Sequence, residues 1–127
     1  MRAIDTHVLV RLIARDDAAQ TTLAEAFIEK GAWVPLIALV ETAWILDAVY
    51  ARTAEQIATC VDMLLSHQQL VLDRGEIVEA ALGQFRAKPK AAFGDCLMLE
   101  VARAAGHLPF GTFDKALARR EGASLLA

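Results

Sequence analysis

Residues 32–50 read AWVPLIALVETAWILDAVY, and this stretch decides the type of fold. Residues 32–34 form a short apolar run of the kind found in buried strands. Pro35 follows at a position that the first turn of a helix tolerates, and residues 36–50 continue with helical character. A strand that leads directly into a helix is the unit from which parallel sheets are built, so the stretch predicts a β-α unit.

The same alternation of short strands and helices continues on both sides of this stretch. We expect strands at residues 2–5, 32–34, 69–72, 109–113 and 124–127, and helices at residues 6–14, 16–30, 36–50, 53–67, 74–87, 95–105 and 114–121, with a loop around Pro89. Thr6 is a candidate N-cap, and Thr53 and Gln56 have the spacing of a capping box. The pattern predicts a single α/β domain over residues 1–127, a three-layer α/β/α fold with a short-stranded central parallel sheet.

Composition limits the class of protein. The chain has 127 residues, of which 56% are hydrophobic and 23% charged, which excludes a disordered chain. Its mean hydropathy of +0.37 is high for a small domain, so part of the apolar surface is expected to face a partner. The net charge of −3 excludes a strongly basic nucleic-acid binder but allows a local basic patch.

Cysteine usage and hydropathy point to a cytoplasmic protein. Cys60 and Cys96 form no C-x-x-C motif, so free thiols are expected rather than a zinc site or a redox pair. No stretch approaches the roughly 20 apolar residues that span a membrane. Asp5 and Arg11 interrupt any signal-peptide core near the N-terminus.

Four carboxylates stand in apolar surroundings. Asp5 ends the first expected strand, Asp114 follows the fourth, Asp95 begins a largely apolar helix, and Glu41 lies inside one. Structural roles are available for each: a turn for Asp5, an N-cap for Asp114, a first-turn acid for Asp95 and a surface position for Glu41. Glu41 is the hardest to explain in this way. Residues 31–51 contain no Lys or Arg to pair with it, and a buried unpaired carboxylate costs several kcal/mol.

Convergence of the four acids on one cavity explains them together. Right-handed crossovers place the carboxyl ends of parallel strands at one edge, where ligands bind. At a separation of ~4 Å and an effective dielectric constant of ~20, each pair of carboxylates repels by ~4 kcal/mol. A divalent cation would offset this repulsion, and an all-oxygen site suits Mg²⁺ or Mn²⁺.

At these residues the chain resembles the PIN-domain nucleases, in particular the VapC-type toxins of toxin–antitoxin pairs. The resemblance rests on IDTHVLV with Asp5, VETAWIL with Glu41, FGDCLMLEVARAAG with Asp95, and TFDKALA with Thr112 and Asp114. It covers nearly the whole chain, from about residue 2 to residue 126. Each motif is weak alone, but the four in this order and spacing match the family well.

The resemblance implies a Mg²⁺- or Mn²⁺-dependent endoribonuclease. It implies that the metal ligands and catalytic groups are Asp5, Glu41, Asp95 and Asp114, with Thr112 and Thr6 as supporting groups behind them. His7 stands where the family more often has a small polar residue, which leaves the substrate preference open.

The resemblance also implies partners: a homodimer, and a cognate antitoxin that lays an amphipathic segment in an apolar groove. The helix at residues 57–65 and the stretch 44–50 are candidate linings of this groove, although both are equally compatible with a core.

Several basic residues are candidates for RNA binding through phosphates: Lys90, Lys115, Arg119 and Arg11. An ordinary solvated surface is the alternative for each. If the four acids hold a metal ion, 13 basic and 12 acidic residues remain, which permits RNA binding. Trp33 and Trp44 lie in apolar patterns and are expected in the core, so we expect the protein to recognise RNA by shape rather than by base stacking.

Two other functions compete with the nuclease. Asp73 ends the third expected strand, as the acceptor of a phospho-acceptor receiver domain would, but that fold needs paired acids after the first strand and only Asp5 is present. A PIN-like domain that only binds a partner is the other alternative, and the complete set of four acids argues against it.

Overall fold

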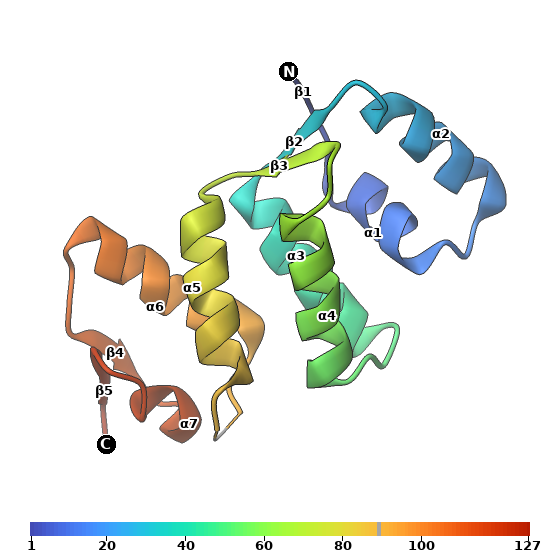
Figure 1. Ribbon diagram of the computed structural model, residues 1–127. Helices are drawn as coiled ribbons and strands as arrows, with labels where there is room; N and C mark the ends of the chain where they lie inside the picture. Colours follow the sequence, from blue (N-terminus) through green and yellow to red (C-terminus); the bar gives the residue numbers. More distant parts are fainter. Residues whose placement is uncertain (89) are drawn as a thin grey trace. The chain divides into compact units, whose positions relative to one another are not determined.

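The computed structural model describes residues 1–88 and 90–127. Its strands are β1 (Arg2–Ala3), β2 (Ala32–Val34), β3 (Leu70–Leu72), β4 (Phe110–Thr112) and β5 (Ala123–Leu125), and its helices are α1 (Thr6–Ala14), α2 (Ala18–Ile28), α3 (Leu36–Ala48), α4 (Ala54–Leu65), α5 (Gly75–Arg86), α6 (Phe93–Ala105) and α7 (Lys115–Ala118) (Figure 1). Each strand and helix expected from the sequence is therefore confirmed, with ends that shift by a few residues. Of the loop expected around Pro89, Pro89 itself lies outside the described residues.

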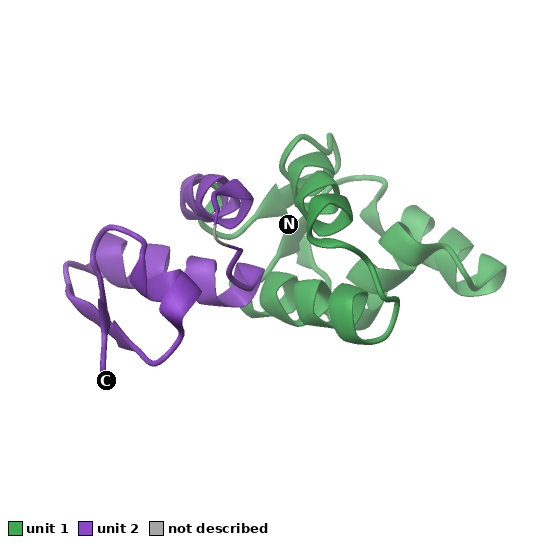
Figure 2. Cartoon of the chain, turned by 90° about the horizontal axis from the view of Figure 1, so that it is seen from below, with its two compact units in different colours: residues 1–75 green, residues 76–127 purple. Residues whose placement is uncertain are grey.

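The chain forms two compact units, residues 1–75 and residues 76–127 (Figure 2). The first contains a parallel sheet in the order β1-β2-β3, in which Ala32 of β2 pairs with Arg2 and with Leu70. The second contains the parallel pair β4-β5. Parallel strands joined by helices confirm the predicted α/β fold class of PIN type. The single domain over residues 1–127 stays a prediction.

The core of the first unit lies where the inner faces of its sheet and helices meet. Ala32 and Val34 of the central strand are buried, and so are Leu9 of α1 and Leu39 and Leu46 of α3. Successive strand residues point to opposite faces, which places Trp33 between the two buried positions on the other face of the sheet.

The expectation that both tryptophans are buried is wrong. Trp33 is 37% exposed and Trp44 is 66% exposed. On α3, residues seven positions apart share a face, so Ile37 and Trp44 lie together on the outer side while Leu39 and Leu46 face inward. The outer face of this helix is apolar as well as the inner one, and the sequence pattern alone did not separate them.

Capping side chains mark the starts of α1 and α4. The capping box of α4 is confirmed, because the Thr53 side chain accepts from the Gln56 backbone N–H while the Gln56 side chain accepts from the Thr53 N–H. The expected N-cap of α1, Thr6, is wrong by one residue. Asp5 takes the cap, since its backbone is extended and its carboxylate reaches the N–H of Val8.

The second unit has its own core of apolar side chains from α5, α6 and α7. Phe85 and Phe93 meet edge to face with ring centroids 5.6 Å apart, and Leu97, Leu99 and Leu117 are buried with them. Glycine ends α6, because Gly106 adopts a left-handed conformation with φ of 82° that favours this residue. No helix among the described residues is long and apolar enough to cross a membrane.

Candidate active site

Asp5 is placed by the end of β1 and the start of α1. The backbone N–H of buried Ile4 donates to the Trp33 carbonyl at 3.1 Å, which holds this end of the strand beside β2. The Asp5 carboxylate is exposed, and its Oδ1 accepts from the Val8 N–H at 3.0 Å. The cap uses Oδ1, so Oδ2 remains available to bind another group. Thr6, an expected supporting group, is buried directly beside it.

Glu41 lies in the middle of α3, and its side chain is exposed. The argument that Glu41 is a buried unpaired carboxylate is therefore wrong. The outer face of α3 carries Ile37 and Trp44, so apolar neighbours in the sequence do not imply burial there. Exposure leaves both of its carboxylate oxygens accessible to solvent and to a ligand.

Asp95 and Asp114 form an acidic pair in the second unit. Asp95 lies in the first turn of α6 and is half-buried. Burial raises the pKa of the Asp95 carboxyl, and repulsion from Asp114 raises it further. The structure therefore brings these two of the four expected acids within electrostatic reach of each other.

Asp114 is held by contacts on both sides. Its Oδ1 accepts from the Leu117 N–H at 3.0 Å, which confirms it as the N-cap of α7. The Asp114 backbone N–H donates to Oγ1 of Thr112 at 3.0 Å. Thr112 thus supports the backbone of Asp114, and the capping arrangement again leaves Oδ2 for another ligand.

The donor set suits a hard divalent cation. All four expected ligands are carboxylates, and oxygen donors are those that Mg²⁺ and Mn²⁺ prefer. After burial, repulsion from Asp114 is the second cause of the raised pKa of Asp95, and a cation would offset this repulsion. Among the residues that the structure describes, no three His, Cys, Asp or Glu side chains gather closely enough to hold a metal ion. The convergence of all four acids on one site stays a prediction.

The expected RNA-binding residues differ in their surroundings. Lys90, Lys115 and Arg119 are exposed. Arg11 is already engaged, with its guanidinium 3.1 Å from Oδ1 of Asp16. It also donates to the Tyr50 hydroxyl at 3.3 Å. Arg11 therefore ties the end of α1 to neighbouring segments of its own unit.

The sequence pattern did not predict that two charged residues, Glu100 and Arg120, are buried. Glu100 pairs with Arg103 at 3.3 Å, one turn further along α6. Glu100 and Arg120 both lie within electrostatic reach of the thiol of Cys96, whose pKa is raised to about 11, chiefly by burial. Glu100 stands between Leu99 and Val101 in the sequence, and this apolar flank was the available signal for its burial.

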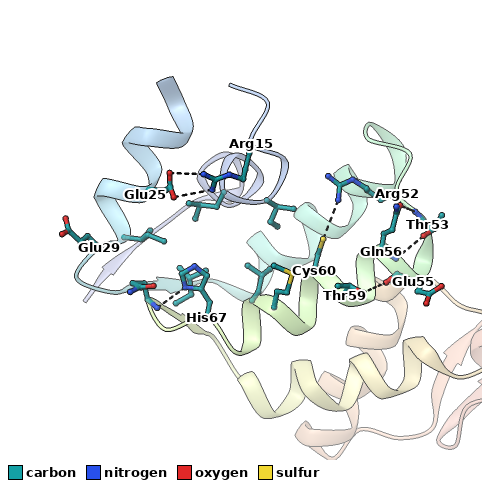
Figure 3. A pocket seen from close by; sticks show the side chains of 17 residues that line it. Arg15, Glu25, Glu29, Arg52, Thr53, Glu55, Gln56, Thr59, Cys60 and His67 are labelled. Carbon is teal, nitrogen blue, oxygen red and sulfur yellow. Dashed lines mark hydrogen bonds and ion pairs between the residues drawn. The ribbon is translucent and has the colours of Figure 1, made fainter. Parts of the chain in front are cut away.

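The first unit also carries a groove of about 930 Å³ (Figure 3). Its apolar lining includes Leu12, Ile28 and Met63, the last of which is 64% exposed. Charged groups line it as well, with Arg15 paired to Glu25 at 3.3 Å. Helix α4 contributes several lining residues, whereas none of those that line the groove comes from residues 44–50.

Comparison with known proteins gives one result for nearly the whole chain. A family model described as PIN domain matches residues 3–123, a range that includes all four expected acids. No curated protein matches the chain.

Proposed function

We propose that this chain, which belongs to the PIN domain family, is a divalent-metal-dependent endoribonuclease that hydrolyses the phosphodiester bonds of RNA. Membership indicates a nuclease-type fold and hence a hydrolase acting on nucleic acids. The observation that carries the proposal is the acidic pair Asp95 and Asp114. Both residues belong to the motifs that resemble the family, and two carboxylates that repel each other favour a cation between them.

The metal ligands in this proposal are Asp5, Glu41, Asp95 and Asp114, and the ion is Mg²⁺ or Mn²⁺. When bound, such an ion polarises a phosphate and makes water a better nucleophile at neutral pH. The chain itself supplies orientation. Capping hydrogen bonds to Val8 and Leu117 fix one oxygen each of Asp5 and Asp114, and Thr112 holds the backbone at Asp114.

RNA binding is proposed for the exposed cations Lys90, Lys115 and Arg119, whereas Arg11 is engaged by Asp16. Contacts from such residues to phosphates position the strand without reading its sequence. With the acids occupied by a cation, the remaining charge balance of 13 basic and 12 acidic residues no longer repels a polyanion.

The sharpest test uses Glu41, because an exposed glutamate inside a helix contributes little to stability. We expect Glu41→Gln to abolish Mn²⁺-dependent cleavage of RNA while its melting temperature stays at the wild-type value. Asp47→Asn is the matched control, since Asp47 is an exposed acid on the same helix and is not an expected ligand. The control must cleave RNA normally, and wild-type cleavage by Glu41→Gln would contradict the assignment.

The same assay separates the alternatives. A PIN-like module that only binds a partner would cleave no RNA with any divalent metal. The family match favours the nuclease over a phospho-acceptor receiver domain. Transfer of phosphate from a small phosphodonor to Asp73 would reverse that preference.

We further propose that the protein is the toxin of a cytoplasmic toxin–antitoxin pair. The groove of the first unit supports this proposal, because an apolar lining with a charged border suits an amphipathic segment of an antitoxin. Exposed large apolar residues such as Ile37 and Phe113 support a further contact, for which we propose a homodimer. A monomeric mass in light scattering would contradict the homodimer.

A further inference from the structure

Arg120 is the only lysine or arginine in the chain's described residues that is buried, with 6% of its surface exposed. Burying a guanidinium is costly unless hydrogen bonds compensate it. Its Nη2 donates to the Ala87 carbonyl at 3.1 Å, and its Nη1 donates to the Ala116 carbonyl at 3.5 Å. The side chain therefore joins two segments of the second unit that are far apart in the sequence.

Those two segments carry the acidic pair. Ala116 belongs to α7, whose N-cap is Asp114, and Ala87 lies on the segment that leads from α5 to α6, where Asp95 occupies the first turn. A guanidinium that holds both carbonyls thus restrains α7 relative to the segment at Ala87 that precedes α6.

The guanidinium contacts both segments at backbone carbonyl oxygens. Asp114 is fixed to the start of α7 by the hydrogen bond that its Oδ1 accepts from the Leu117 N–H, so a restraint on α7 also restrains this carboxylate. The contribution of Arg120 to the position of the acids therefore comes through the backbone that it holds.

We propose that Arg120 is a positioning residue that holds Asp95 and Asp114 together in the absence of metal, so that the cation meets a preformed pair. This inference rests on the proposed function, since it concerns the same acids. Held carboxylates lose less conformational freedom when a cation binds, and groups behind the ligands commonly change metal affinity by roughly 10- to 100-fold.

The test measures binding of Mn²⁺ alone to the full chain by isothermal titration calorimetry. We expect Arg120→Met, which keeps the apolar stem and removes the guanidinium, to weaken Mn²⁺ binding by roughly tenfold or more. An exposed cation of the same unit gives the matched control, and Lys88→Met should bind Mn²⁺ as the wild type does. Folded Arg120→Met with the wild-type dissociation constant would overturn the proposal.

Arg120→Lys keeps the inference testable if Arg120→Met does not fold. Lysine retains the charge and the stem, but its single ammonium lacks the fork that reaches two carbonyls. Weaker Mn²⁺ binding by this variant supports a positioning role, whereas a lower melting temperature with unchanged Mn²⁺ binding shows a purely structural role and overturns it. If the wild type binds no Mn²⁺, the proposed function fails and this inference fails with it.

Discussion

Asp5 has two separable roles, and one pair of substitutions distinguishes them. Its Oδ1 caps α1 through the Val8 N–H, and its remaining oxygen is proposed to bind metal. Asparagine caps helices about as well as aspartate, so Asp5→Asn removes the charge and keeps the cap. Asp5→Ala removes both.

The expected magnitudes follow from this geometry. Loss of an N-cap costs about 1 kcal/mol, and loss of a negative charge at an exposed helix N-terminus costs about 0.3–1 kcal/mol. Asp5→Ala should therefore lower the free energy of unfolding by about 1–2 kcal/mol, and Asp5→Asn by at most about 1 kcal/mol. For a chain of this size, about 1 kcal/mol corresponds to about 3–5 °C in the melting temperature.

The assay combines thermal melting in EDTA with Mn²⁺-dependent RNA cleavage. We expect both Asp5 variants to lose cleavage, although only Asp5→Ala loses substantial stability. Asp17 is the matched control, because it caps α2 in the same way, with Oδ1 3.0 Å from the Gln20 backbone nitrogen. Asp17→Ala should lose stability and keep cleavage.

Two outcomes would refute this reasoning. Cleavage at the wild-type rate by Asp5→Asn would show that the Asp5 charge is not part of the metal site. Equal losses of stability in Asp5→Asn and Asp5→Ala would show that the cap is not what Asp5 contributes to α1.

Two other predictions concern the acidic pair and the groove. Burial and repulsion from Asp114 raise the pKa of Asp95, so the folded wild type loses stability as the pH rises through that pKa and the carboxyl ionises. Asp95→Asn removes this ionisation. In EDTA at pH 7 it should therefore have a higher melting temperature than the wild type, and the difference should shrink as the pH is lowered. A variant that melts below the wild type at pH 7 would contradict the repulsion. Met63→Glu places a charge in the apolar lining of the groove, so it should weaken inhibition by the antitoxin while leaving RNA cleavage by the free protein unchanged. Unaltered inhibition in a titration with the antitoxin would place the partner elsewhere.

Local signals in the sequence were sufficient for the fold. Short apolar runs gave the strands, and capping residues such as Thr53 and Asp114 gave helix starts to within a few residues. The error at Thr6 has a local cause, because Asp5 and Thr6 are both good caps and the sequence does not show which backbone is extended.

Burial was harder to predict wherever a helix is apolar on most sides. In α3 apolar residues occupy both faces, so periodicity could not show that Trp44 and Glu41 lie on the outer one. The opposite error applies to Glu100 and Arg120. Charged residues are seldom buried, and only the packing of α6 and α7 shows that these two are.

The four acids of the candidate site differ in what holds them before a metal binds. Asp5 and Asp114 are both N-caps, so a backbone N–H fixes one oxygen and limits the orientation of the other. Glu41 lies on an exposed helix face, and Asp95 is half-buried and repelled by Asp114. Metal affinity should therefore depend most on what restrains Asp95 and Asp114 against that repulsion, which is the reason to look for the decisive support at the buried guanidinium of Arg120 rather than at the exposed glutamate.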